Sequence, residues 1–163
     1  MRKYWQALKK WGDRYRVELA VGALVFLADQ ITKTAVMWFL PDTPVKITPF
    51  FQLRYVENTG AAFGMMQGGN LVLIFIMLAI IAYILKSWKE LCAHGAAVRW
   101  GCVFILAGAI GNLYDRIMLG YVVDFLDFLV WPVFNVADSF ITVGGCLFAW
   151  SLLFTRPKKQ EEK

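Results

Sequence analysis

The sequence predicts an all-α membrane protein, with four transmembrane helices, a small extracytoplasmic β-sheet and a second outer loop. Three observations predict this fold class. Of the 163 residues, 59% are hydrophobic and 18% are charged, whereas a soluble domain is roughly 45–50% apolar and about 25% charged. Four apolar stretches are long enough to cross about 30 Å of hydrocarbon as helices. The basic residues gather on one side of these stretches.

The composition also excludes several classes of protein. Charged residues are too scarce for a disordered chain, and the sequence has no heptad or Gly-X-Y period. The three cysteines form no CxxC spacing, and the chain has a single histidine. This pattern excludes a disulfide scaffold and a zinc-finger or His-rich metal site. We therefore expect no metal ion and no cofactor.

The expected spans cover residues 17–40, 71–86, 99–115 and 136–155 of a single domain over residues 1–163. Asp29, Gln30 and Lys33 interrupt the first span, whereas the second has no interruption. The third is rich in Gly and Ala, which allows tight packing against a neighbouring helix of this chain or of another copy. The fourth carries Asp138 near its start. The sequence leaves the oligomeric state open.

The distribution of basic residues predicts the orientation. Thirteen of the 17 lysines and arginines precede the first span, separate the second from the third, or follow the fourth. Because positively charged loops are retained in the cytoplasm, we expect both termini to be cytoplasmic and the basic start to be part of a retained span rather than of a cleaved signal. The net charge of +5 is thus an orientation signal, and we expect no nucleic-acid partner.

Two segments, residues 41–70 and 116–135, then lie outside the cytoplasm. Residues 51–57 alternate in a β-prone pattern, and Asn58, Thr59 and Gly60 follow as a turn signal. This pattern predicts a small sheet on the outer membrane surface. Residues 121–128, with Trp131 and Pro132, are apolar enough to lie in the membrane interface as the second outer loop.

Five of the 12 acidic residues fall at the outer edge of the spans or in the second outer loop, although they are spread over a hundred residues of chain. An ionisable group at bilayer depth costs about 2.5–3.5 kcal/mol on insertion scales and indicates function by default. That they converge on one level is the most informative feature of the sequence. These residues are Asp29, Asp115, Asp124, Asp127 and Asp138.

Some of these acids have a purely structural interpretation. The i, i+4 spacing of Asp29 and Lys33 places them on one helix face, where they neutralise each other. Arg116, at the end of the third span, has the reach to pair with a nearby carboxylate. We expect Asp127 to be a solvated loop carboxylate. Asp138 also fits a helix N-terminal acid favoured by the macrodipole.

Asp124 and Asp138 together suggest chemistry. Two carboxyl groups in a poorly hydrated site do not both ionise easily, so one keeps its proton and the other loses it. The ionised group then takes a proton from water while the protonated one polarises a peptide carbonyl, as in aspartic proteases. The alternative nucleophile is Ser139 with Lys33 as its base. Cys102 and Cys146 have no histidine near them.

Five motifs occur in one order along the chain, and together they closely resemble those of bacterial lipoprotein signal peptidase (signal peptidase II). The resemblance extends over residues 19–154 and includes the layout of four spans with both ends inside. Each motif is weak alone, whereas five in order are highly specific. They are DQITK (29–33), NTGAAFG (58–64), GNLYDR (111–116), VVDF (122–125) and FNVADS (134–139).

The resemblance implies an aspartic endopeptidase of the bacterial cytoplasmic (inner) membrane. Such an enzyme removes the signal peptide of a prolipoprotein just before a cysteine modified with diacylglycerol, needs no metal or cofactor, and is the target of the cyclic peptide globomycin. Its catalytic pair corresponds to Asp124 and Asp138. Its supporting residues correspond to Asp29, Lys33, Asn58, Gly60, Asn112, Asp115, Arg116, Asn135 and Ala137.

Three other functions compete with this interpretation. A small proton-coupled exporter also has short spans with membrane carboxylates, but it would place them near mid-bilayer between repeated halves, and no repeat is visible. An assembly subunit would use the charges to pair with partner helices. An intramembrane-cleaving aspartyl peptidase carries a Gly-x-Gly-Asp pattern, which this sequence lacks.

Overall fold

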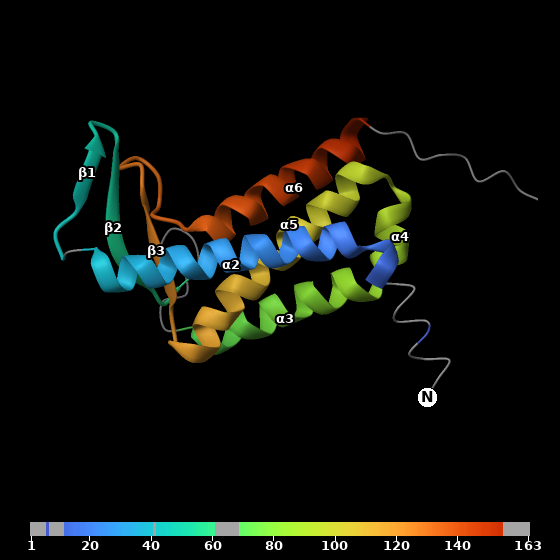
Figure 1. Cartoon of the computed structure of the whole chain (residues 1–163), viewed down its shortest axis with the longest axis horizontal. Coiled ribbons are helices and arrows are strands. Elements are labelled where there is room, and N and C mark those ends of the chain that lie inside the picture. Colours follow the sequence, from blue (N-terminus) through green and yellow to red (C-terminus); the bar gives the residue numbers. More distant parts are fainter. Residues whose placement is uncertain (1–5, 7–11, 41, 61–68, 155–163) are drawn as a thin grey trace, which may run out of the picture.

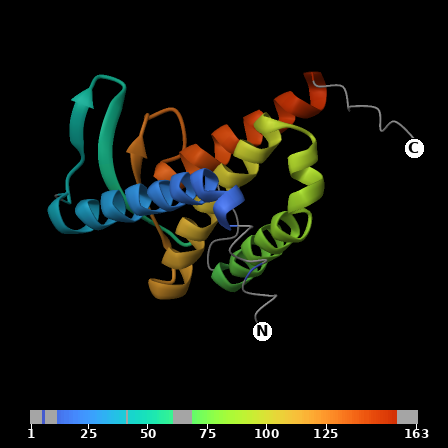
Figure 2. The ribbon, with the colours of Figure 1, turned by 45° about the vertical axis from the view of Figure 1, so that its right-hand side comes forward.

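The computed structural model describes residues 6, 12–40, 42–60 and 69–154. Its long helices run between a sheet at one end of the molecule and the short helix α4 at the other, in both ribbon views (Figures 1 and 2). The described start of α2 and the end of α6 both lie near α4. The elements are α2 (Arg16–Phe39), β1 (Val45–Thr48), β2 (Phe51–Asn58), α3 (Asn70–Lys86), α4 (Trp88–Ala93), α5 (Ala96–Met118), β3 (Val122–Asp127) and α6 (Val136–Phe154).

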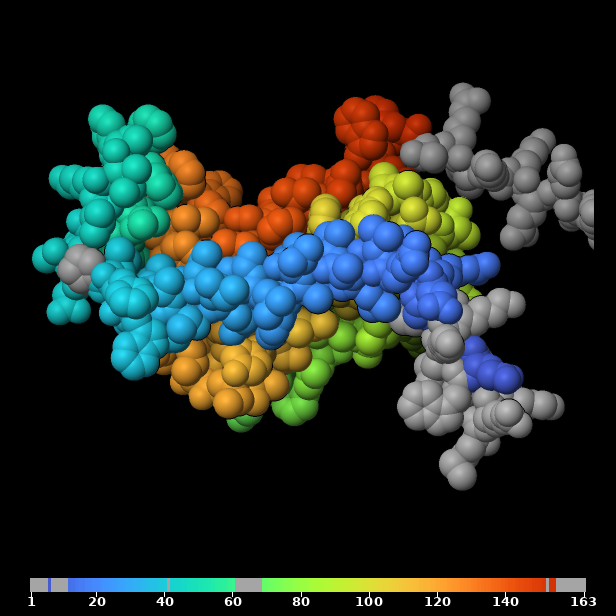
Figure 3. All heavy atoms as spheres, viewed as in Figure 1, coloured from blue at the N-terminus to red at the C-terminus, as the bar shows by residue number. Residues whose placement is uncertain are grey.

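Four of these helices coincide with the expected spans to within three residues at the bounds that the structure describes. α2 and α5 are long and apolar enough to cross a membrane, whereas α3 and residues Val136–Ser151 of α6 are shorter apolar helices. That all four cross a membrane stays a prediction. Large apolar side chains of α2 and α3 are exposed, among them Leu24 at 65% and Phe75 at 68%, as expected for helices that contact lipid. α2 crosses the face shown in Figure 3, from the sheet end to the α4 end.

α5 is the central helix and contacts every other helix named above. Its small residues allow α6 to approach closely, because a Cβ added at Gly101 would lie 2.7 Å from the main-chain oxygen of Gly144. A Cβ at Gly111 would similarly lie 2.7 Å from Oδ2 of Asp29. The tight packing expected for the third span is therefore confirmed, and its neighbours belong to the same chain.

The sheet is antiparallel, in the order β1-β2-β3. β2 confirms the expected strand, and the turn after it is closed by a hydrogen bond from the N–H of Gly60 to Oδ1 of Asn58 at 3.0 Å. Residues 61–64 of the second motif lie outside the described residues.

The expectation of an interfacial loop over residues 121–128 is wrong. Residues 122–127 form strand β3, which pairs with β2 along its length, with Val56 opposite Asp124, and is almost completely buried. A short apolar run fits a buried strand as well as an interfacial loop by its pattern alone, and the pairing with β2 decides between them. As a result, Asp124 lies inside the protein rather than at its surface.

The α4 end has no polar network comparable to that of the sheet end among the described residues. α4 was not expected from the sequence, and it buries Trp88 and Leu91 against Val98 and Cys102 of α5. Burial of these side chains is the ordinary hydrophobic stabilisation of a helix bundle. The polar chemistry of this protein therefore lies at the sheet end of the helices.

Candidate active site

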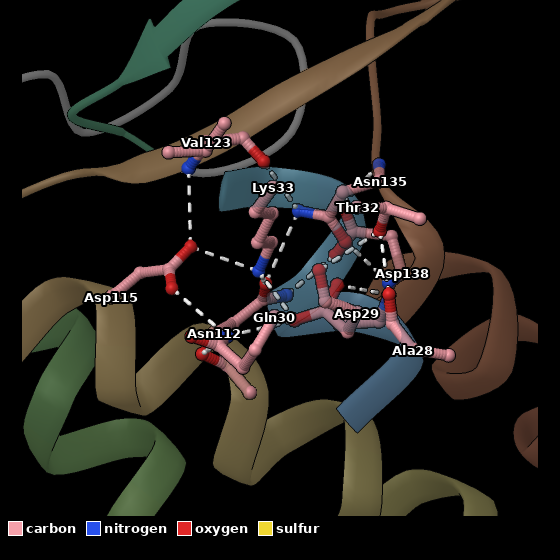
Figure 4. A network of polar contacts seen from close by, with 12 residues as sticks. Ala28, Asp29, Gln30, Thr32, Lys33, Asn112, Asp115, Val123, Asn135 and Asp138 are labelled. Atoms are coloured by element: carbon pink, nitrogen blue, oxygen red, sulfur yellow. Dashed lines mark hydrogen bonds and ion pairs between the residues drawn. The ribbon is translucent and has the colours of Figure 1, made fainter. Parts of the chain in front are cut away.

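Lys33 forms the centre of a buried polar network (Figure 4). Its side chain is 1% exposed, and Nζ lies 2.8 Å from Oδ2 of Asp29 and 2.9 Å from Oδ2 of Asp115. Nζ also donates a hydrogen bond to Oδ1 of Asn112 at 2.9 Å. These partners occupy the three donors of an ammonium group. The expected i, i+4 pair of Asp29 and Lys33 is thus confirmed, and α5 supplies the remaining partners.

The two carboxylates around Lys33 also bind main-chain groups. Oδ1 of Asp29 accepts the N–H of Ala137 at 2.8 Å, and Oδ2 of Asp115 accepts the N–H of Val123 at 3.2 Å. The first bond joins residues 108 positions apart in the sequence, and the second joins the end of α5 to the next strand, eight positions on. The network thereby fixes the first turn of α6 and the start of β3 relative to α2 and α5.

Gln30 is a member of this network that the sequence analysis did not assign to the site. Its Nε2 donates to Oδ2 of Asp29 at 3.0 Å and to Oδ1 of Asp115 at 3.1 Å. Its sequence signal is its position between Asp29 and Lys33 in the DQITK motif. That signal was available, but a helical wheel does not reveal that Gln30 reaches α5.

Asp138 caps the start of α6. The side chain of Asn135 accepts the N–H of Asp138 at 2.8 Å, and Oδ2 of Asp138 accepts the N–H of Asn135 at 3.3 Å. This reciprocal pair is a capping box, so the helix N-terminal interpretation of Asp138 is confirmed. The cap uses one carboxylate oxygen. The other, Oδ1, accepts a hydrogen bond from Nδ2 of Asn112 at 2.7 Å.

Asp124 lies on β3 and is 1% exposed. Its Oδ1 accepts Nδ2 of Asn135 at 2.7 Å, and its Oδ2 accepts Nδ2 of Asn58 at 2.8 Å. Asn135 therefore contacts both Asp124 and Asp138. Burial, followed by the charge of Asp138, raises the pKa of Asp124 to about 7, against the hydrogen bonds from Asn58 and Asn135 and the charge of Lys33.

Both acids open onto one pocket of about 990 Å³. Asn58, Asn112 and Arg116 contribute polar atoms to its wall. Most of the apolar wall comes from helices α3 and α6 and from the segment before α6, and Val56 of β2 and Val122 of β3 complete it, so the pocket lies between α3 and α6. The apolar residues include Leu73, Met77, Pro132, Val133, Phe134, Ile141 and Val143.

Arg116 bonds to neutral groups rather than to a carboxylate. Its Nη2 donates to the main-chain oxygen of Gly60 at 2.6 Å, and its Nη1 donates to Oδ1 of Asn70 at 3.1 Å. The guanidinium is buried. Among the described residues Arg116 therefore does not form the carboxylate pair that its reach allows, and Lys33 holds Asp29 and Asp115 instead.

The expectation that Asp127 is a solvated carboxylate is also wrong. Asp127 is 4% exposed, and its Oδ2 accepts Nε2 of Gln52 at 2.8 Å and Nε of Arg54 at 3.0 Å. Its Oδ1 accepts the N–H of Leu129 at 2.9 Å. Burial favours its protonated form, but these bonds outweigh burial and hold the pKa of Asp127 below its usual value.

The alternative nucleophile is not assembled. The hydroxyl of Ser139 donates to the main-chain oxygen of Asn135 at 2.9 Å, while Nζ of Lys33 is occupied by Asp29, Asp115 and Asn112. A serine needs an adjacent unoccupied base to become a nucleophile. In the part of the chain that the structure describes, no three His, Cys, Asp or Glu side chains converge as a metal site would require.

Comparison with known proteins gives one consistent result. A family model described as signal peptidase (SPase) II matches residues 21–154, which include every expected site residue. The chain is 39% identical over 144 residues to a lipoprotein signal peptidase of Pelotomaculum thermopropionicum, covering 86% of this chain and 94% of that protein. It is 44% identical over 141 residues to one of Caldanaerobacter subterraneus subsp. tengcongensis, covering 83% and 95%. A solved structure described as a bacterial membrane enzyme has a TM-score of 0.81 at 27% identity, covering 90% of this chain and 94% of that one.

Proposed function

This chain belongs to the signal peptidase II family, and from that premise we propose that Asp124 and Asp138 together catalyse the removal of signal peptides from prolipoproteins. The chain is a membrane peptidase. The observation that supports the dyad is the pair of carboxyl groups on one pocket, bridged by the side chain of Asn135. The two acids come from consecutive elements, β3 and α6, and line the same pocket although each disfavours the ionisation of the other.

The proposed chemistry needs one proton shared between the two acids. The ionised carboxylate takes a proton from water, and that water attacks the scissile carbonyl carbon. The protonated carboxyl donates a hydrogen bond to the carbonyl oxygen as negative charge develops on it. When the tetrahedral intermediate collapses, the C–N bond breaks, and the acid that took the proton from water gives it to the leaving amine. A pKa of about 7 for Asp124 supports a single proton on the pair near neutral pH.

The surrounding residues orient this pair. Asn112 is held by Lys33 and donates to Asp138, while Asn135 donates to Asp124. Because the oxygen of Asn112 accepts from Lys33, its nitrogen is directed at the carboxylate. Buried networks of this kind fix a geometry when every member is satisfied. Asp29 and Asp115 complete the set by neutralising Lys33.

The pocket supports a lipid-modified substrate. Its apolar wall between α3 and α6 suits a signal helix and a diacylglyceryl group that arrive from within the bilayer, since moving buried acyl chains into water costs about 0.8 kcal/mol per methylene. On this proposal the pair cuts just before the lipidated cysteine, the strands β1 and β2 lie over the bound peptide, and globomycin competes for the same pocket.

We place the enzyme in the bacterial cytoplasmic (inner) membrane with four spans and the sheet end outside. Lys86 and Lys89 lie around α4, and Arg16 and Arg99 begin the helices at that end. Basic residues of this kind mark the cytoplasmic side. The active-site pocket is then at the outer face, where a translocated prolipoprotein presents its cleavage site.

The test uses purified wild-type, Asp124→Asn and Asp138→Asn proteins with a diacylglyceryl-modified prolipoprotein and its unlipidated twin. We expect cleavage by the wild type alone and of the lipidated substrate alone. Cleavage by either variant at the wild-type rate would exclude the dyad. Equal cleavage of both substrates would leave the dyad intact and exclude the lipid requirement.

A further inference from the structure

Asn70, the first residue of α3, holds Arg116 at two points. Its Oδ1 accepts a hydrogen bond from Nη1 of Arg116 at 3.1 Å, and its Nδ2 donates one to the main-chain oxygen of Arg116 at 3.1 Å. The second bond fixes the backbone near the end of α5, and the first fixes the guanidinium. The amide of Asn70 therefore holds both the main chain and the guanidinium of a buried arginine. The bond from the guanidinium is charge-assisted.

A chain of hydrogen bonds connects the guanidinium of Arg116 to Asp124. While Nη1 is held by Asn70, Nη2 donates to the main-chain oxygen of Gly60 at 2.6 Å. The N–H of Gly60 in turn donates to Oδ1 of Asn58 at 3.0 Å, and Nδ2 of Asn58 donates to Oδ2 of Asp124 at 2.8 Å. Because the side-chain oxygen of Asn58 accepts a hydrogen bond from Gly60, the orientation of the amide is fixed and its nitrogen points at Asp124. The chain of contacts from Asn70 therefore ends on a carboxylate oxygen of Asp124.

We propose that Asn70 is a positioning residue of the peptidase, which holds Arg116 against Gly60 and thereby holds Asn58 against Asp124. Asn70 touches neither acid and does not line the pocket, so it acts through Arg116. The inference rests on the proposed function, because it requires Asp124 to be catalytic. None of the five sequence motifs includes Asn70.

The geometry predicts a specific change when Asn70 is truncated. Arg116 then loses its anchor, and Asn58 is held less firmly against Asp124. The hydrogen bond from Asn58 favours the ionised form of Asp124, so its loss raises the pKa of that group further. Lys33 from α2, Arg116 from α5 and Asp138 from α6 also interact with Asp124 through their charges. Of these, Asn70 contacts only Arg116, and withdrawal of that cation raises the pKa of Asp124 in the same direction. Activity should fall above neutral pH as the two acids lose their shared proton, and we expect this fall to occur at higher pH in Asn70→Ala than in the wild type.

The experiment measures kcat and KM of the full chain against pH, with a diacylglyceryl-modified prolipoprotein as substrate. For Asn70→Ala we expect kcat to fall about tenfold, because small displacements of catalytic groups lower rates strongly, with a smaller change in KM. Asn70→Gln keeps both the acceptor for Nη1 and the amide donor to the main-chain oxygen of Arg116, and we expect its pH dependence to lie closer to that of the wild type than that of Asn70→Ala does. Leu71→Ala, at the exposed next position, is the matched control and should match the wild type.

Arg116→Lys supplies the decisive background, because a lysine does not hold both Asn70 and Gly60 as the guanidinium does. If Asn70 acts through Arg116, Asn70→Ala produces no further loss and no further pH shift when added to Arg116→Lys. Additive losses would overturn the proposal, and so would an unmoved pH limb in Asn70→Ala. Should Asn70→Ala fail to fold, Asn70→Ser makes the same test.

Asp124→Asn is assayed alongside these variants so that the two proposals fail separately. An active Asp124→Asn protein would exclude the dyad and with it the inference about Asn70. An inactive Asp124→Asn protein with a fully wild-type Asn70→Ala protein would exclude the inference alone.

Discussion

Strand β3 carries two buried aspartates, one in its middle and one at its end, and their chemical surroundings are opposite. Asp124 is 1% exposed, and its hydrogen bonds in the described part of the chain come from the neutral amides of Asn58 and Asn135. Asp127 is 4% exposed and meets the guanidinium of Arg54, as well as neutral donors. Because their positions differ by three, and side chains alternate along a strand, the two carboxylates point to opposite faces of β3.

The difference shows that burial alone does not make an acid reactive. Burial and the neighbouring Asp138 raise the pKa of Asp124 to about 7, which suits proton transfer near neutral pH. The hydrogen bonds and the charge of Arg54 outweigh burial at Asp127 and lower its pKa. The partners of a buried carboxylate therefore decide whether it suits catalysis or structure.

Exchanging each acid for its amide gives the largest expected contrast. We expect Asp124→Asn to lower turnover of a lipidated prolipoprotein by about 10⁴-fold or more, the scale on which loss of a catalytic group acts. Asp127→Asn should stay within about threefold of the wild type, because Asp127 does not line the pocket. Equal losses of turnover in the two variants, measured on proteins with intact folds, would show that the two aspartates of β3 do not differ in function.

The pH dependence of stability sharpens the contrast, with a smaller effect. The raised pKa of Asp124 contributes stability that is complete below about pH 4 and is lost as pH rises through about 7. The lowered pKa of Asp127 contributes stability above its ordinary pKa of 3.8, which is lost as pH falls through its folded value. Melting followed by tryptophan fluorescence should show both declines in the wild type.

Each amide variant should act on one decline only. Asp124→Asn should weaken the decline towards neutral pH. Asp127→Asn should weaken the acid-side decline and melt about 5 °C lower at pH 7, since hydrogen bonds to a charged group contribute about 1.5–3 kcal/mol. If the stability of Asp127→Asn declined at acid pH as it does in the wild type, the lowered pKa of Asp127 would make no contribution to stability.

The sequence predicted the helices and the first pair of the network because both depend on local spacing. Apolar runs located α2, α3, α5 and α6, and the i, i+4 rule joined Asp29 to Lys33. The sequence also predicted that several acids lie at one end of the molecule. The Lys33 network and the pocket confirm their position. Periodicity and spacing suffice where the partners lie within a turn of helix or at its ends.

The roles of the acids on β3 did not follow from spacing. The run around Asp124 and Asp127 is apolar with two acids, and its pattern fits a loop or a strand equally well. The partner that distinguishes Asp127 is Arg54, on a strand of a separate segment. Asn70 was likewise missed because its partner Arg116 lies on another helix. Long-range pairing, which no local pattern reports, fixed these residues.

The smallest effect isolates the charge of Arg54 from the neutral donors to Asp127. Because the side chain of Arg54 is 46% exposed, solvent screens the pair, and exposed ion pairs are worth about 0–1 kcal/mol. We expect Arg54→Ala to lower the melting temperature by about 1–3 °C at pH 7 and to begin the acid-side decline at a higher pH. Gln52 and the N–H of Leu129 still hold the carboxylate in that variant. If Arg54→Ala lowered the melting temperature as much as Asp127→Asn does, Arg54 alone would keep Asp127 ionised. One half-exposed cation would then account for the difference between the two aspartates of β3.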